Sequence, residues 1–546
     1  MSFTIRLRRP LNIWVLLAVL IVLLLGTPIY TVLFGLLPGP GPNWSHMVKY
    51  LLADYVVNSI LLVVGTGLLT LLWGVPSAWF VSTLEFRGRR FWEWILILPL
   101  SIPTYIMAFT YAGIFDYTGP LQSIIRNSTG LNLASYLDIM NLPGVMVVMS
   151  LALFPYVYVI CRAAFQTRYR SLIEASQVLG ASSSRSFFKV ILPVARPALV
   201  AGVTLVVMEV LNDYGAVKYF GVPTFTTGIF RSWFSYEDPQ GAIYLSSLLL
   251  LFVFLAILFE KYQRGGARYD SQVPVERPLP RKKPSGWMSP VVVCSCAIPA
   301  VLGFIVPVLQ LIWWSIQSFD SIGYSKLGSM VSNSFLLACA AAAFCVGIAV
   351  ILIFATRLRN SRWLQSAVRL STMGYAVPGA VIAVGVLIPL LFLDKLWIHL
   401  MSGWNIQVGL LLTGTVFGLL FAYSVRFLAV AFNPIESGFQ RVGKSLHEVA
   451  ATLGVKPWRI LHRINIPLLR GALLSAGLLV FIDVLKELPL TLILRPFNFN
   501  TLATRAFELA TDELVAAAAV PSLVIILTGV VPIHLLNILI TKQKWL

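Results

Sequence analysis

Long apolar stretches separated by short polar segments make up most of the 546-residue chain. A helix that crosses a bilayer needs about 17 to 25 mainly apolar residues. Twelve stretches of roughly this length cover about 12–36, 55–82, 93–114, 143–164, 197–219, 241–260, 288–315, 333–356, 366–393, 407–432, 471–494 and 515–541. The pattern therefore predicts an all-α polytopic membrane protein with about 12 transmembrane helices.

One segment of the chain occurs twice at a fixed offset. The repeated pairs lie 274 positions apart: Glu174 and Glu448, Gly180 and Gly454, Pro193 and Pro467, and Arg196 and Arg470. Six helices per copy is an even number, so both copies enter the membrane from the same side and form parallel repeats. We expect a first six-helix repeat at 1–260, a linker at 261–287 and a second repeat at 288–546, fused as a pseudo-dimer.

Charge then orients the chain. The formal net charge is +19, and the positive residues gather in alternate loops, in the N-terminal segment and in the Pro-rich and Gly-rich linker 261–287. Excess Lys and Arg marks the cytosolic side of a membrane protein. We therefore expect both termini, the linker and both repeated loops to be cytosolic. The basic charge is then explained by orientation beside membrane lipid, and no nucleic-acid partner is indicated.

The two repeated loops share a local design. Each reads as a short helix, a glycine turn, a second amphipathic segment and a proline near the next membrane helix. Gly180 and Gly454 suit the left-handed residue that ends a helix, and Pro193 and Pro467 suit the first turn of the helix that follows. Apolar residues of the first loop, Leu172, Val178, Leu179, Phe187 and Phe188, are candidates for insertion into a groove on another protein.

These loops resemble the cytosolic signature of permeases in binding-protein-dependent ABC importers, which reads Glu-Ala-Ala, three residues, Gly, nine residues, Ile-x-Leu-Pro. The first copy has Ser176 for the second Ala and Val190 for Ile, and the second has Val449 for the first Ala. The resemblance implies a type I importer permease fold in a bacterial inner membrane. It assigns ATPase coupling to Glu174, Ala175, Gly180, Pro193, Glu448, Ala450, Gly454 and Pro467. Two amphipathic loops lying on the lipid surface are the alternative.

The same resemblance implies partners. In that family the loop docks onto a cytosolic ATPase dimer, and an extracytoplasmic binding protein delivers the solute. We expect no nucleotide-binding pattern of the form G-x4-G-K-S/T, so the ATPase is a separate polypeptide. We also expect no catalytic residue in this chain, because it offers no convincing nucleophile, base or metal-hydrolase cluster. The chain is then a permease subunit and not an enzyme, it binds no cofactor, and ATP and Mg²⁺ are used by the separate ATPase.

Acidic residues inside predicted spans are the candidate pathway. Glu209 and Asp213, followed by Tyr214, recur as Asp483 and Glu487. A rise of about 1.5 Å per residue from Arg196 places Glu209 roughly 20 Å into the bilayer, where a charge costs roughly 2.5–3.5 kcal/mol. One hypothesis is a set of oxygen ligands that pass a multivalent cation inward without forming a stable metal site. The other is a salt-bridge lock between helices, because Lys486 is adjacent.

The stretches from Glu209 to Phe234 and from Asp483 to Glu513 resemble the fused permeases of ferric iron importers, over essentially the whole chain. This similarity implies Fe(III) as the solute. Fused permeases for thiamine or phosphonate-type solutes are similar in size and remain alternatives. A different class, an ion-gradient-driven secondary transporter, also fits parallel six-span repeats with intramembrane acids.

Overall fold

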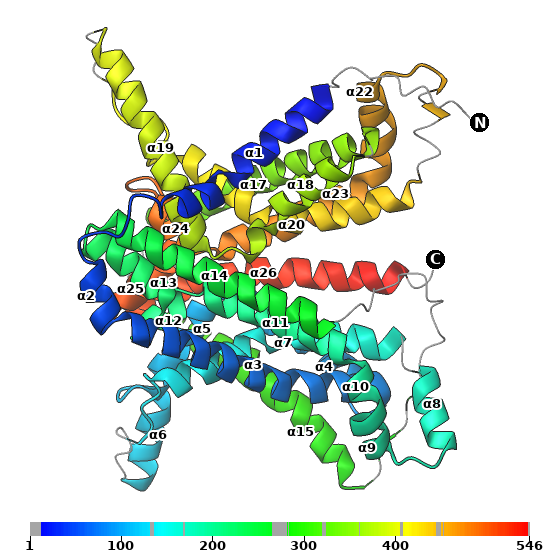
Figure 1. Ribbon diagram of the computed structural model, residues 1–546. Coiled ribbons are helices and arrows are strands. Elements are labelled where there is room, and N and C mark those ends of the chain that lie inside the picture. The colour runs from blue at the N-terminus through cyan, green and yellow to red at the C-terminus, as the bar shows by residue number, and fades with distance from the viewer. Residues whose placement is uncertain are drawn as a thin grey trace. The chain divides into compact units, whose positions relative to one another are not determined.

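The computed structural model shows a helical protein (Figure 1), described over residues 13–130, 136–167, 170–264, 281, 283–284, 286–318, 324–359, 361–404, 408–443, 449–450 and 452–543. Within these residues, ten helices are long and apolar enough to cross a membrane. Two bent pairs, 89–101 with 104–129 and 184–194 with 196–212, bring the number to as many as twelve. Each of these twelve overlaps one predicted stretch, and the expected all-α fold is confirmed.

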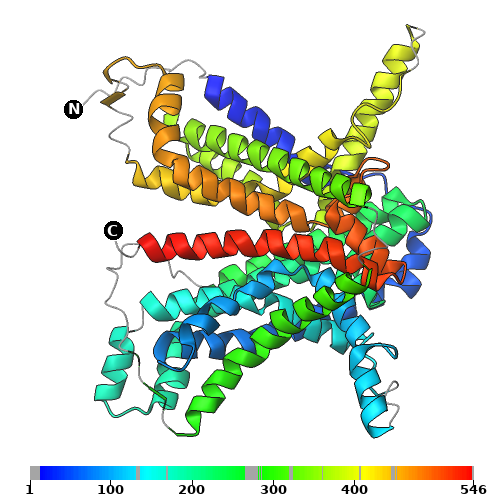
Figure 2. The same ribbon diagram turned by 180° about the vertical axis from the view of Figure 1, so that it is seen from behind.

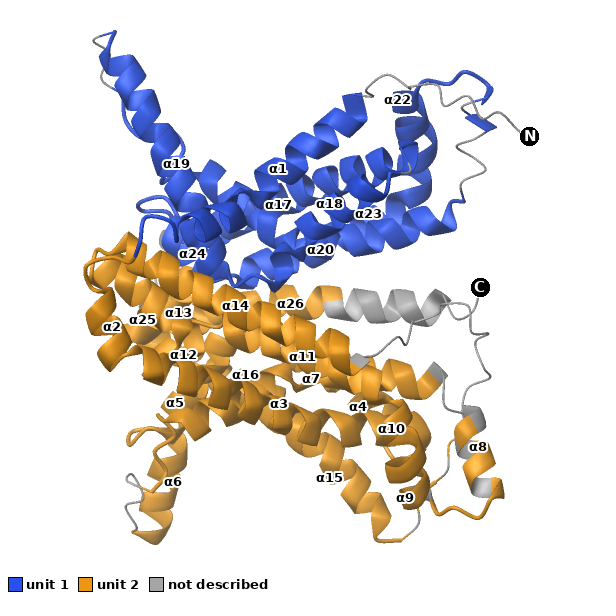
Figure 3. Cartoon of the chain, in the orientation of Figure 1, with its two compact units in different colours: residues 1–39, 329–501 blue, residues 40–328, 502–546 orange. Residues whose placement is uncertain are grey.

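The chain divides into two compact units, residues 1–39 with 329–501 and residues 40–328 with 502–546 (Figure 3). The first unit contains α1 (Ile13–Phe34), α17 (Tyr324–Leu358), α18 (Arg362–Ser371), η6 (Thr372–Ala376), α19 (Gly379–Ser402), α20 (Val416–Arg441), α22 (Pro457–Ile460), η7 (Leu461–Asn465), α23 (Ile466–Lys486) and α24 (Pro489–Leu494). In this unit, α20 packs along α23, and α1 packs along α19.

The second unit begins with α2 (Trp44–Tyr50), α3 (Leu52–Thr83), α4 (Arg89–Ile95), η1 (Leu98–Ser101), α5 (Thr104–Phe115), α6 (Pro120–Thr129), α7 (Leu142–Thr167), α8 (Arg170–Val178), α9 (Ser183–Ser186), η2 (Phe187–Ile191) and α10 (Leu192–Val194). It continues with α11 (Arg196–Asn212), α12 (Gly215–Tyr219), α13 (Phe225–Phe230), η3 (Arg231–Ser235), α14 (Pro239–Arg264), α15 (Met288–Ala300), η4 (Val301–Ile305), α16 (Val306–Ser318), α25 (Leu502–Thr511) and α26 (Val515–Gln543).

Small residues let the helices of the second unit approach closely. A Cβ atom placed on Gly74 of α3 or on Gly202 of α11 would lie 3.0 Å from Val157 of α7. Helices in a bilayer gain little from excluding water, so close backbone approach and dense packing hold them together. The triple contact of α3, α7 and α11 is therefore set by glycine on the two outer helices.

The units do not follow the two repeats. The first helix of the chain, α1, lies in the unit formed mainly by the second repeat, against α18, α19 and α20. Reciprocally, the first helices of the second repeat, α15 and α16, lie in the unit formed mainly by the first repeat, where α15 runs beside α3 and α16 beside α5 (Figures 1 and 2). Each repeat thus contributes its first helix to the other unit.

The contact between α1 and α19 depends on a glycine. A Cβ atom on Gly385 would lie 2.4 Å from the carbonyl oxygen of Pro28, whereas nothing lies within 4 Å of a Cβ atom on Gly347 of α17. We expect Gly385→Ala to lower the free energy of unfolding by about 1–3 kcal/mol, because the backbones must separate. Gly347→Ala, the matched control, raises or preserves stability. Thermal unfolding in detergent measures both, and equal shifts would contradict the close contact.

Candidate coupling loops and capped helix breaks

The first repeated loop ends its helix as its sequence predicts. Gly180, just after α8, has a φ of +79°, and the N–H of Ala181 donates to the carbonyl of Ser176 at 2.9 Å. A backbone hydrogen bond across a residue in the left-handed conformation is typical of the C-terminus of a helix. The second loop repeats it, because Gly454 has a φ of +71° and the N–H of Val455 donates to the carbonyl of Ala450 at 3.0 Å.

The remaining coupling candidates take several positions. Glu174 and Ala175 are exposed on α8, and Ala450 is buried. Pro193 and Pro467 stand in the first turns of α10 and α23. Glu448 lies outside the described residues.

A π-helical turn precedes each of these prolines. In the first repeat it is η2 and in the second it is η7, at the same offset in sequence. A proline within a helix loses one backbone donor and its ring crowds the carbonyl four residues earlier. A wider turn relieves that crowding, and such turns are frequent at functional sites. The repeat therefore preserves a local backbone distortion as well as a sequence.

Exposed apolar side chains surround both glycine turns. Val178 and Leu179 are 87% and 86% exposed, and Leu453 is 76% exposed in the second loop. Phe187 differs from the expectation that it is exposed for docking, because its ring packs on Trp79 with centroids 4.8 Å apart. Clustered exposed apolar side chains mark a surface that contacts another protein or the membrane.

The expectation that the chain lacks a G-x4-G-K-S/T pattern was wrong at the level of the letters. Residues 438–445, Gly-Phe-Gln-Arg-Val-Gly-Lys-Ser, match this pattern of a nucleotide-binding loop. Such a loop needs a preceding strand and a glycine-rich turn that wraps phosphate. Here Gly438 lies inside α20, which continues to Arg441. A Cβ atom on Gly438 would lie 2.8 Å from the Cβ atom of Ala472 on α23, so this glycine serves helix packing. The match is not a phosphate-binding loop.

The candidate pathway acids lie where two membrane helices break. The sequence predicts a continuous helix that carries Glu209 and Asp213 one turn apart. Instead α11 ends at Asn212, Asp213 is extended, and α12 begins at Gly215. In the second repeat, α23 ends at Lys486, Glu487 is extended, and α24 begins at Pro489. The expectation of a continuous helix was wrong at the same place in both repeats.

Two of these acids, Asp213 and Glu487, each cap the helix that follows the break. Asp213 Oδ1 accepts the backbone N–H groups of Ala216 at 2.9 Å and Val217 at 3.3 Å. Glu487 Oε1 accepts the N–H of Leu490 at 3.2 Å. The first N–H groups of a helix have no partner inside it, and an apolar surrounding makes an unpaired group costly. The acids satisfy these donors.

The second oxygen of each acid is tied to a different partner. Asp213 Oδ2 accepts the hydroxyl hydrogen of Thr104, the first residue of α5. Glu487 Oε2 lies 3.1 Å from Nε of Arg426, and the two side chains are only 6% and 4% exposed. Nη1 of Arg426 also donates to the carbonyl of Val377, just before α19.

Sequence reasoning missed Thr104 and Arg426. Arg426 offered a signal, because it is a basic residue inside the predicted span 407–432, and a charge within a membrane helix is a functional or pairing candidate. Thr104 offered none, since threonine is common in membrane helices.

Glu209 and Asp483 lie one turn before the breaks and are partly exposed. Tyr214 is buried and stacks on Phe230, with ring centroids 3.6 Å apart. The breaks therefore separate the acids into two kinds: two buried caps and two partly accessible carboxylates.

Comparison with known proteins identifies the class. The family model described as the binding-protein-dependent transport system inner membrane component matches the chain twice, at residues 50–265 and 347–544. The chain belongs to this family, and the two matches confirm the repeat. It is a multi-pass membrane protein of the ABC importer permease class.

Among individual proteins, the chain is 28% identical over 530 residues to the Fe(3+)-transport system permease protein FbpB 2 of Haemophilus influenzae, covering 95% of this chain and 97% of the relative. It is 23% identical to the putative ferric transport system permease protein FbpB 1 of the same organism, covering 80% and 70%. It is also 27% identical to a probable sulfate transport system permease protein of Chlorella vulgaris, over 40% of this chain and 85% of the relative.

The buried pair of Arg426 and Glu487 yields a stability test. Arg426→Met leaves a buried carboxylate unpaired, so we expect it to lower the free energy of unfolding by about 3–5 kcal/mol. The double variant Arg426→Met/Glu487→Gln removes both charges, keeps a side-chain oxygen for the N–H of Leu490, and recovers most of that loss. Thermal unfolding of the three proteins in detergent measures the difference. A double variant no more stable than Arg426→Met would contradict the importance of the pair.

Proposed function

We propose that this chain is the membrane-spanning subunit of an ATP-driven importer of Fe(III) in a bacterial inner membrane, with both termini cytosolic. The observation that carries the proposal is similarity to an Fe(3+) permease over 95% of the chain, together with two loops that keep the glycine turn and exposed apolar side chains. An extracytoplasmic binding protein supplies the iron, and a cytosolic ATPase dimer supplies the energy.

The coupling loops perform the first part of this task. ATP closes the ATPase subunits, and the two loops move with them because their apolar side chains are buried in the ATPase. The permease then alternates between outward-open and inward-open forms, and hydrolysis resets it. The chain itself makes or breaks no covalent bond and holds no cofactor.

Carboxylates in the membrane perform the second part. Fe(III) is a hard cation that favours oxygen ligands, and carboxylates offer these while a transient contact lets the ion leave. Glu209 and Asp483 are the partly exposed acids and contact the passing cation. Asp213 and Glu487 hold the helix breaks, which accounts for their burial. The pathway hypothesis thus applies to Glu209 and Asp483, and the hypothesis of a structural lock applies to Asp213 and Glu487.

Charge placed on the loop tips tests the coupling. We expect Val178→Asp combined with Leu453→Asp to reduce recovery of the co-expressed ATPase with the permease by about tenfold or more, because both apolar contacts are central. Tyr262→Asp puts the same charge on a side chain 83% exposed near the end of α14 and retains the ATPase. Affinity purification through the permease gives the ratio. Equal recovery from both variants would contradict docking at these loops.

Uptake tests the solute. A strain lacking this chain receives the wild type or Glu209→Gln/Asp483→Asn. We then measure uptake of radiolabelled iron, supplied as ferric citrate, and of radiolabelled sulfate. We expect the wild type to restore iron uptake alone, and the variant, inserted normally, to lose about tenfold or more, since the hard cation loses its charged ligands. Restoration of sulfate uptake instead would favour the second candidate, an oxyanion importer, which the similarity to sulfate permeases supports.

A further inference from the structure

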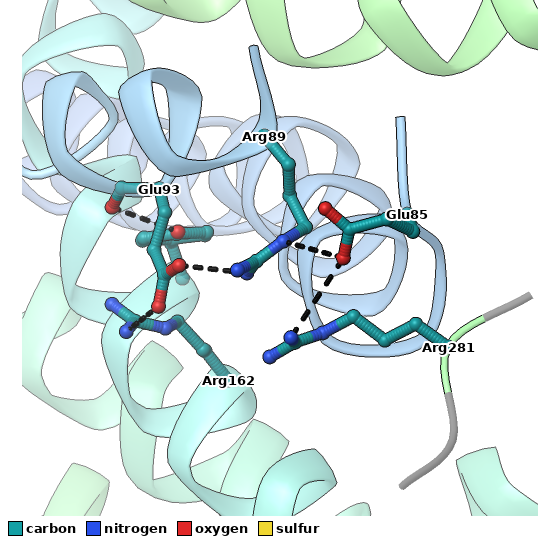
Figure 4. A network of polar contacts seen from close by, with 6 residues as sticks. Glu85, Arg89, Glu93, Arg162 and Arg281 are labelled. Atoms are coloured by element: carbon teal, nitrogen blue, oxygen red, sulfur yellow. Dashed lines mark hydrogen bonds and ion pairs between the residues drawn. The ribbon is translucent and has the colours of Figure 1, made fainter. Parts of the chain in front are cut away.

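A network of charged side chains lies beside the end of the helix that leads into the first coupling loop. It joins Glu85, Arg89 and Glu93, at and before α4, with Arg162 of α7 and Arg281 of the linker (Figure 4). Neither the coupling residues nor the pathway acids belong to it. Its members nevertheless lie on elements that connect those two sites.

Glu93 is the centre of the buried part of the network. One carboxylate oxygen lies 2.7 Å from Nη1 of Arg89, and the other is paired with Nη2 of Arg162. The hydroxyl of Tyr158 donates to the backbone carbonyl of Glu93 at 3.1 Å. The side chains of Glu93, Arg89 and Arg162 are 22%, 7% and 18% exposed. Charges this sheltered from solvent hold their geometry more firmly than surface pairs.

On one side, Arg162 connects Glu93 to the coupling loop. Arg162 lies in the last turns of α7, which ends at Thr167, and α8 begins at Arg170. A displacement of α8 therefore reaches Arg162 through a short length of chain. The pair with Glu93 passes it to α4.

On the other side, the backbone connects Glu93 to the helix break. From α4 the chain continues through turns closed by hydrogen bonds, from the N–H of Ile97 to the carbonyl of Trp94 at 3.0 Å and from the N–H of Ile102 to the carbonyl of Pro99 at 3.0 Å. Two residues later, Thr104 begins α5 and its hydroxyl donates to Asp213. Movement of α4 thus reaches the carboxylate that caps α12.

We propose that Glu93 is a positioning residue that relays movement of the first coupling loop to the helix break at Asp213, along Arg162, Glu93, α4 and Thr104. The relay rests on the proposed function, because it needs an ATPase that moves α8. The second repeat has a shorter connection, since α20 leads into its coupling loop and itself carries Arg426, the partner of Glu487. The two repeats therefore tie coupling loop to helix break by different routes.

Amide hydrogen exchange of segment 213–219, in the complex of full-length permease and ATPase, tests the relay without reference to the transported solute. Exchange is compared with and without ATP bound to a hydrolysis-deficient ATPase. We expect a clear ATP-dependent change in the wild type, and a change at least about fivefold smaller in Glu93→Gln and in Thr104→Val. The double variant Glu93→Gln/Thr104→Val loses no more of the ATP-dependent change than either single variant, because interrupting one step already stops a relay whose steps act in series.

Arg281→Gln is the matched control. Arg281 belongs to the same network, but its pair with Glu85 spans 3.8 Å and the two side chains are 33% and 48% exposed, so it contributes little. It keeps the wild-type response. An ATP response retained in Glu93→Gln, or additive losses in the double variant, would overturn the relay alone. A wild-type permease that binds no ATPase would instead overturn the proposed function.

Discussion

A membrane helix satisfies its own backbone hydrogen bonds, and any break in it exposes donors and acceptors to a solvent that cannot pair with them. The structure breaks α11 and α23 at the same repeated position and supplies a carboxylate for the donors at each break. The positions of the side chains around each break follow from this requirement. The carboxylate must stay charged or strongly hydrogen-bonded inside protein, so it needs partners of its own, and those partners link the break to distant elements.

The two repeats meet this requirement with different chemistry. A neutral hydroxyl serves Asp213, while a buried guanidinium serves Glu487. The partners come from different helices, α5 in one unit and α20 in the other. Duplication followed by divergence of the two copies accounts for this: the backbone break is kept, and the side chains that stabilise it are free to differ. The exchange of first helices joins the two copies further, because each unit is completed by a helix of the other repeat.

The sequence predicted the number and approximate position of the membrane helices, because long apolar stretches have few alternative structures. It also predicted the left-handed glycines at 180 and 454, since a repeated glycine after a short amphipathic helix has a specific backbone use. The breaks at Asp213 and Glu487 were not predictable in this way. Each break falls on a polar pair, Asn212 with Asp213 and Lys486 with Glu487, that long apolar segments flank. Hydropathy averaged over a span therefore shows one helix, and the break depends on capping contacts in three dimensions.

Side-chain partnerships were equally hidden. Glu93 is the first residue of the predicted span 93–114, and its partner Arg162 is 69 positions away. Pairings over that distance depend on how α4 and α7 pack, which periodicity does not encode. The letters of residues 438–445 fit a nucleotide-loop pattern, yet Gly438 lies inside α20 and packs against α23. A short pattern of letters therefore does not establish the structure that it usually marks.

The most direct test of the account is transport by purified components. The chain is reconstituted into vesicles with its ATPase and an iron-loaded binding protein, and entry of radiolabelled Fe(III) is measured with ATP, with a non-hydrolysable analogue and with an imposed proton or sodium gradient. We expect entry only with ATP and only in the presence of the binding protein. Entry that proceeds without ATP and follows the ion gradient would contradict it.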